Sequence, residues 1–224
     1  MRRAAPGVAA VLFAGLAALT GCGSDALTTP VGAAVPPTAE AAAPTPAAAN
    51  ALAGLAVAPS GFLKGSPDDP TQLNGPFTRQ AFVDVLSASP AKDLALLLNA
   101  GCKDGYRTFR LSPDRRKRVT VQLFKTTSKA RAQDLQKGFW SQDEHGSPFA
   151  VPGLPGALTD ARTEVDGVTG KFEAVAEASI TVGAMVAEVT VSQTGTIDKP
   201  PAPDVKLATT MIRLQQARLT TNSG

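Results

Sequence analysis

The sequence predicts an α+β fold in which helices cover an antiparallel sheet, and a disordered linker precedes this domain. Stretches of alternating apolar and polar residues predict strands, and stretches with helical spacing lie before, between and after them. The strand–helix–strand repetition that builds a parallel sheet is absent from the sequence. A segment rich in Ala and Pro, with almost no charge and no aromatic residue, separates the N-terminus from the domain.

The N-terminus has the three parts of a bacterial lipoprotein signal peptide. Arg2 and Arg3 are followed by an apolar run from Val8 to Leu19, which is too short for a membrane-spanning helix of about 20 residues. The run ends in Leu-Thr-Gly-Cys, which resembles a lipobox. The resemblance implies cleavage before Cys22 and lipidation of its thiol, with palmitate-like acyl chains as the anchor. An ordinary secretory signal peptide with an incidental cysteine is the alternative.

A lipid anchor at Cys22 would place the chain on the extracytoplasmic face of the cell membrane, within the cell envelope, because buried acyl chains hold a protein on a bilayer without a spanning helix. We therefore divide the sequence into a signal peptide (1–21), a lipidated and disordered linker (22–60) and one α+β domain (61–220). The linker contains too little apolar surface to offset the conformational entropy that folding costs.

The net charge of +3 overstates how basic the mature chain would be. Removal of Arg2 and Arg3 leaves 20 basic and 19 acidic residues. Such a balance gives no support to nucleic-acid binding. The only cysteine besides Cys22 is Cys102, so the fold is not a disulfide scaffold.

Helix signals are clearest in the first half of the domain. Thr78 is a predicted N-cap for a helix to about Leu86, and Ser89-Pro90 starts a second helix that ends at Gly101. Ser128 starts a third helix, through Trp140. The intervening residues predict strands over Tyr106 to Leu111 and Val119 to Phe124, and the segments from Gly65 to Gly75 and from Ser141 to Gly156 are predicted loops.

The second half of the domain predicts a hairpin and a final helix. Residues Lys171 to Thr181 and Met185 to Gln193 alternate apolar and polar side chains, and Gly183 lies between them at a tight turn. Asp204 is a predicted N-cap for a helix from Val205 to Leu219. The hairpin, this helix and the loop Val151 to Gly156 resemble the LpqN-like group of actinobacterial envelope lipoproteins, which has a PsbP-type α+β fold. The resemblance implies a role in binding or interaction at the envelope.

Few residues suggest catalysis or metal binding. His145 is the only histidine, and its neighbours Asp143 and Glu144 diverge along the chain, so a solvated loop is favoured over a metal site. The sequence has no nucleophile elbow and no phosphate-binding loop, and it predicts no cofactor. Cys102 could be a reactive thiol or an intermolecular bridge, but packing as a small apolar residue is favoured.

The densest charge feature is a basic run at Arg115, Arg116, Lys117 and Arg118, with Arg107 and Arg110 shortly before it. The run could contact anionic lipid headgroups or a cell-wall polyanion, although a solvated turn between strands is favoured. The sequence therefore predicts a non-catalytic binding or interaction module with an envelope protein, lipid or wall polymer as partner. A carrier of a lipid or small molecule, with an apolar cavity, is the first alternative, and an enzyme is the disfavoured one.

Overall fold

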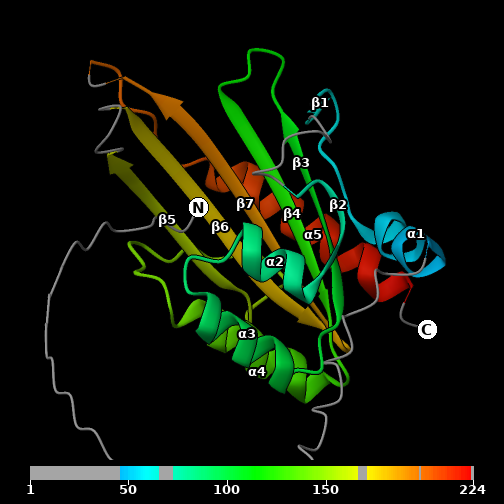
Figure 1. Cartoon of the computed structure of the whole chain (residues 1–224). Helices are drawn as coiled ribbons and strands as arrows, with labels where there is room; N and C mark the ends of the chain where they lie inside the picture. Colours follow the sequence, from blue (N-terminus) through cyan, green and yellow to red (C-terminus); the bar gives the residue numbers. More distant parts are fainter. Residues whose placement is uncertain (1–45, 66–72, 166–170, 197, 223–224) are drawn as a thin grey trace, which may run out of the picture.

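The computed structural model describes residues 46–65, 73–165, 171–196 and 198–222, and it shows a mixed α/β architecture built on one antiparallel sheet (Figure 1). The sheet has seven strands in the order β1-β3-β4-β7-β6-β5, and β2 pairs with β3 beside β1. The strands are β1 (Leu63–Lys64), β2 (Gly75–Thr78), β3 (Asp104–Leu111), β4 (Lys117–Lys125), β5 (Leu158–Val165), β6 (Phe172–Val182) and β7 (Met185–Gly195). The predicted fold class is confirmed.

Helices lie on both faces of the sheet. They are α1 (Pro46–Leu55), α2 (Arg79–Val85), α3 (Pro90–Asn99), α4 (Lys129–Trp140) and α5 (Val205–Thr221). In Figure 1, α5 crosses behind the sheet, whereas α2, α3 and α4 lie in front of one end of it. None of the helices in the described ranges is long and apolar enough to cross a membrane.

Three of the predicted capping residues form their capping bonds, whereas Ser89 precedes α3 without a side-chain capping bond. The hydroxyl of Thr78 accepts a hydrogen bond from the Ala81 amide, Ser128 accepts one from Arg131, and the carboxylate of Asp204 accepts one from Leu207. These bonds satisfy amide groups that have no partner within the helix.

Two turns use glycines in the positive-φ region, as the sequence predicts. At the end of α3, Gly101 has a φ of 64°, and its amide donates to the Leu98 carbonyl while the Cys102 amide donates to Leu97. This is the Schellman arrangement that ends many helices. Gly183 has a φ of 55° in the two-residue turn of the β6–β7 hairpin.

Each face of the sheet has its own apolar core. Alternate residues of β4, β6 and β7 pack against α5, among them Val121, Ala178 and Val189. On the other face, a cluster of phenylalanines joins the end of β4 to α2 and α4: Phe77, Phe82, Phe124 and Phe139. The second core is confined to one end of the sheet, so α2 to α4 leave the rest of that face open.

The ordered region begins earlier than the sequence predicts. Residues 46–60 belong to the predicted linker, yet they contain α1 and a segment whose Leu52 and Val57 are buried. The fully buried Gln215 of α5 holds this segment: its Nε2 donates to the Leu55 carbonyl at 2.9 Å and its Oε1 accepts from the Val57 amide at 3.0 Å. The linker boundary at residue 60 is therefore wrong, and residues 22–45 of the linker lie outside the described residues.

Three strands were not expected from the sequence. The short β1 and β2 occupy parts of the chain where the sequence predicts domain entry and a loop, and β2 contains Pro76, which is tolerated at a sheet edge. The edge strand β5 carries Asp160, Arg162 and Glu164 at alternate positions, which hides the usual apolar pattern of a strand. Asp160, Arg162 and Glu164 lie on the face of the sheet that α2 to α4 leave partly open.

Candidate functional site

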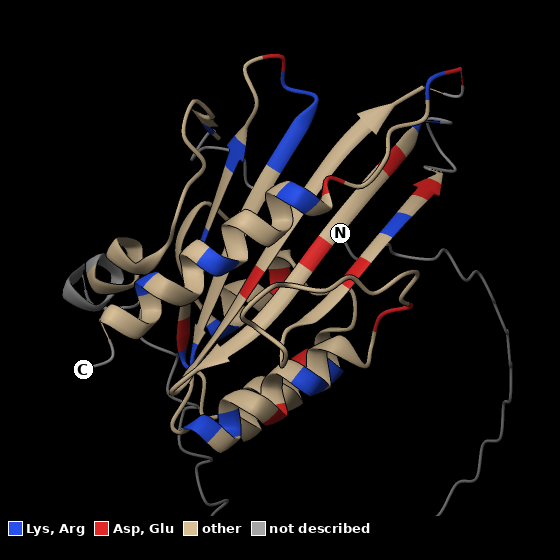
Figure 2. Ribbon diagram, turned by 180° about the vertical axis from the view of Figure 1, so that it is seen from behind, with Lys and Arg blue, Asp and Glu red and all other residues tan. Residues whose placement is uncertain are grey.

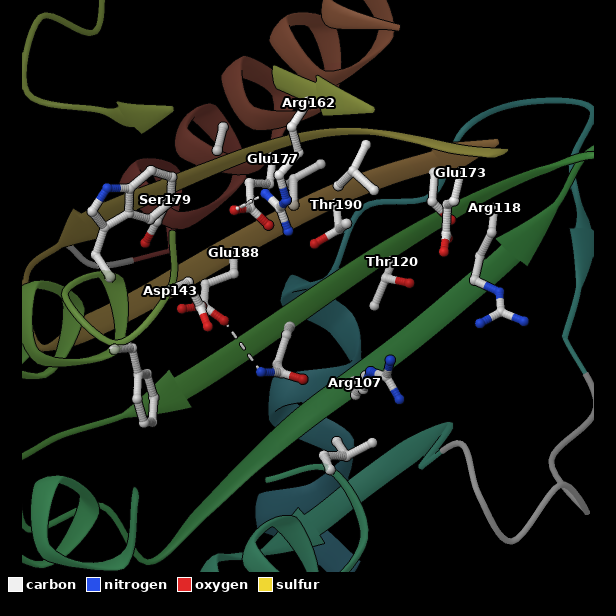
Figure 3. Close-up of a pocket in the computed structure, with 18 of the residues that line it drawn as sticks. Arg107, Arg118, Thr120, Asp143, Arg162, Glu173, Glu177, Ser179, Glu188 and Thr190 are labelled. Carbon is white, nitrogen blue, oxygen red and sulfur yellow. Dashed lines mark hydrogen bonds and ion pairs between the residues drawn. The ribbon is translucent and has the colours of Figure 1, made fainter. Parts of the chain in front are cut away.

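The open part of the sheet forms a polar groove of about 270 Å³. Its floor consists of side chains that point away from α5, and its walls come from Phe82 and Val85 of α2 and from Phe139 and Trp140 of α4. Figure 3 shows side chains that line the groove, with Arg107, Arg118, Arg162, Glu173, Glu177 and Glu188 among those labelled. The polar residues of this floor are Arg107, Arg118, Thr120, Gln122, Arg162, Glu173, Glu177, Ser179, Glu188, Thr190 and Ser192.

Strand register arranges the floor into rows that run across the sheet. One row is formed by Arg107, Gln122, Glu188 and Ser179, on β3, β4, β7 and β6 in turn, because each residue is the register partner of the next. Within the row, Gln122 donates to Glu188 at 3.2 Å (Figure 3). Strands lie about 4.8 Å apart, so the backbones of the first and third members are about 10 Å apart.

Arg107 is the most unusual residue in the groove. Its side chain is only 9% exposed, and its Nε and Nη1 atoms are buried without a hydrogen-bond partner among the described residues. Burial of the charge, and repulsion from Arg118, lower the pKa of Arg107 to about 10. A buried guanidinium normally pairs with an anion because the desolvation of an unpaired charge is costly.

The groove has a basic and an acidic side. Figure 2 shows blue residues concentrated on β3 and β4 and red residues on β5, β6 and β7. In the groove, the basic side consists of Arg107 and Arg118, and the acidic side contains Glu173, Glu177 and Glu188. This separation of charge extends across the strands, so a ligand lying along a row would meet opposite charges at its two ends.

Arg162 neutralises part of the acidic side. Its Nη1 donates to Asp160 at 2.6 Å and to Glu177 at 2.7 Å, and its Nε donates to Glu164 at 2.6 Å. Burial alone would lower the pKa of Arg162, but these three carboxylates outweigh that effect and raise it. The guanidinium therefore stays charged, and it fixes the position of β5 against β6.

His145 comes close to Asp160 and Glu177, with one possible ligand atom of each within 4.8 Å of the others. The arrangement fits a metal ion poorly. Both oxygens of Asp160 already accept hydrogen bonds, from the Gly146 amide and from Arg162. The imidazole of His145 stacks on the Trp140 ring, with the ring centroids 4.2 Å apart, and its Nε2 lies 2.8 Å from the Trp140 carbonyl oxygen. These contacts hold the loop that follows α4 in place.

The four residues of the predicted basic run do not all point to the same side of the sheet. Arg115 and Arg116 lie exposed in the β3–β4 turn, where Arg115 has a φ of 58°. Lys117 forms an ion pair with Asp204 at the start of α5, and only Arg118 points into the groove. Arg116 and Lys117 instead line a second, more open depression with Lys171 and Lys199. Contact of the run with an anionic surface stays a prediction, and Cys22 lies outside the described residues.

Cys102 lies in the apolar core beneath α2 and α4 and is 1% exposed. Burial, together with the nearby charge of Asp104, raises the pKa of its thiol to about 12. The thiolate is the reactive form of cysteine, so the hypothesis of a reactive thiol at Cys102 is wrong, as is that of an intermolecular bridge. Cys102 packs as a small apolar side chain.

Sequence reasoning missed the groove itself. The polar positions of β4 and β7, such as Gln122 and Glu188, have the alternation of an ordinary solvent-facing side of a sheet. Arg107 belongs to the basic group recognised in the sequence, but no sequence pattern distinguishes it from Arg110 or Arg115. The distinguishing fact is its burial, which depends on tertiary packing.

Comparison with known proteins adds little. No family model matches the sequence, and no curated protein matches it. Among solved structures, the chain is similar to the extracellular domain of PknH from Mycobacterium tuberculosis, with 9% sequence identity and a TM-score of 0.43. The similarity covers 78% of this chain and 97% of that chain. Likeness at this level carries no argument about function, so function has to be argued from the groove.

Proposed function

We propose that this chain is a non-catalytic binding module of the cell envelope and that the groove is its ligand site. An acylated Cys22 would hold it on the extracytoplasmic face of the membrane. The observation that carries the proposal is Arg107, a buried cation that lines the groove and whose Nε and Nη1 atoms have no partner among the described residues. A ligand anion beside this guanidinium would recover part of the cost of burying the charge.

The polar lining supports a small polar ligand rather than a lipid. A lipid carrier needs an apolar cavity that encloses acyl chains, whereas most side chains on the floor of this groove are charged or polar. A volume of about 270 Å³ is near the lower end of the range for small-molecule sites. An enzyme is supported less, because the carboxylates beside His145 are engaged by Arg162.

Native mass spectrometry of the full chain, purified in detergent from its own host, tests the ligand site. We expect a small-molecule adduct on the wild type. Thr190→Phe places a ring on the groove floor and should abolish the adduct, whereas Thr163→Phe, at an exposed position of β5, should retain it. A wild-type chain without an adduct, or an adduct that survives Thr190→Phe, would contradict the proposal.

The intact mass of the same material tests the anchor. We expect a chain that lacks residues 1–21 and carries acyl groups at Cys22. A Cys22→Ser variant should remain unprocessed and unlipidated, since the thiol is the acceptor of the lipid. An N-terminus elsewhere, or an unmodified Cys22 in membrane material, would contradict a lipoprotein.

A further inference from the structure

We infer that the ligand of the groove is a small zwitterion, which places an oxyanion on Arg107 and a protonated amine beside Glu188. The inference deepens the proposed function and rests on it. The two residues belong to the same transverse row, with Gln122 between them. The zwitterion would therefore lie across the strands rather than along them.

The anionic end is assigned by the buried guanidinium. Arg107 lies on the groove lining with two nitrogen atoms that find no acceptor among the described residues. Arg118 lines the same side of the groove, so the local field favours an anion. A carboxylate or phosphate oxygen is the natural acceptor for a guanidinium, and it would be bound more strongly here than at an exposed arginine.

The cationic end is assigned by the acidic side. Glu188 lies two strands away from Arg107 along the row, at a backbone separation of about 10 Å. Glu173 lines the same side of the groove and, with Glu188, would repel a second anionic group. A polyanion is therefore excluded from the full length of the groove, and an extended zwitterion matches both sides.

Ser179 provides an independent sign that the row is a binding surface. Its side chain is 1% exposed, it lines the groove, and its Oγ has no hydrogen-bond partner among the described residues. Buried hydroxyl groups are normally hydrogen-bonded, so a partnerless one is unusual. Ser179 is the register partner of Glu188, so this hydroxyl lies next to the proposed amine site in the same row.

A series of ω-amino acids tests the distance between the anion site at Arg107 and the amine site at Glu188. Calorimetric titration of the full chain in detergent at low salt would compare glycine, γ-aminobutyrate, 5-aminovalerate and 6-aminohexanoate. We expect the longer members to bind and glycine to bind weakly, because the charges of glycine are too close together to reach both residues. Acetate and methylamine each carry one of the two charges, and both should bind more weakly than the best zwitterion. O-phosphoethanolamine replaces the carboxylate with a phosphate, so its affinity relative to γ-aminobutyrate identifies the oxyanion.

Variants assign the two ends. Arg107→Gln should weaken binding of the best zwitterion about tenfold or more, and Glu188→Gln should weaken the zwitterion while leaving acetate unaffected. Arg110→Gln, on the opposite face of β3, is the matched control and should bind like the wild type. Equal affinity in Arg107→Gln, or acetate binding as tightly as the best zwitterion, would overturn the inference. Failure of every zwitterion would overturn it too, and a retained native adduct would then leave the proposed function standing.

Discussion

Replacement of Arg107 by glutamine should stabilise the unliganded chain, although most substitutions of buried residues destabilise proteins. Burial and Arg118 lower the pKa of Arg107 from its usual value to about 10. At about 1.4 kcal/mol per pH unit, this displacement corresponds to roughly 3 kcal/mol of unfavourable free energy at neutral pH. Loss of the buried methylene groups offsets part of it, so we expect a net gain of about 1–2 kcal/mol.

Urea unfolding at pH 7 measures this gain, with Arg110→Gln as the control for the removal of one positive charge from β3. Arg110 is half-buried and lies outside the groove, so its variant should differ from the wild type by no more than about 0.5 kcal/mol. A bound zwitterion should stabilise the wild type and have little effect on Arg107→Gln, since ligands stabilise only the state that binds them. A loss of 1 kcal/mol or more in Arg107→Gln would refute the reasoning, because it would mean that the guanidinium has a stabilising partner within the chain.

Three further predictions concern the fold around the groove. Gln215→Leu leaves the Val57 amide and the Leu55 carbonyl without their partner. Urea unfolding should therefore show a loss of about 2–4 kcal/mol in the free energy of unfolding. A loss below about 0.5 kcal/mol would contradict the role of this side chain. Burial raises the pKa of the Cys102 thiol to about 12. At pH 8 the thiol should therefore react with a thiol reagent at least about 100-fold more slowly in the native chain than in urea. Equal rates would contradict the buried position. Burial raises the pKa of Asp204, but the hydrogen bond from Lys117 and the helix-cap bond outweigh it and lower the pKa, so the stabilisation by this carboxylate is present above its ordinary pKa and is lost as the pH falls through the folded value. Thermal unfolding should show Asp204→Ala about 1–2 kcal/mol less stable than the wild type at pH 7, and Asp204→Asn should lose less because it keeps the cap. The difference in stability between the wild type and Asp204→Ala should shrink near pH 2. A difference that stays constant with pH would contradict the ionic contribution.

Local rules were sufficient to predict several elements of this fold. Thr78, Ser128 and Asp204 are capping residues whose hydrogen bonds involve only the next three residues, so their positions can be recognised from sequence. Gly101 and Gly183 adopt positive φ angles at the ends of elements that the apolar pattern already outlines. Where the signal lies within one turn of the chain, sequence and structure agree.

The remaining features depend on contacts between distant parts of the chain. The segment with Leu55 and Val57 has the composition of a linker, and it is ordered because Gln215, about 160 residues later, hydrogen-bonds its backbone. Strand β5 is stabilised by the ion pairs of Arg162 rather than by an apolar stripe. Arg107 has the same local sequence character as its basic neighbours, and its burial follows from the tertiary structure rather than from its own segment. No pattern in a single segment shows such contacts.

The pH titration of the Arg107 Cζ chemical shift, with and without a bound zwitterion, tests the central claim most directly. Free Arg107 should titrate with a midpoint near pH 10, because burial of its charge and repulsion from Arg118 lower its pKa. With 5-aminovalerate bound, the carboxylate should stabilise the charged form and raise the midpoint. A midpoint that the ligand leaves unchanged would contradict an anion site at Arg107.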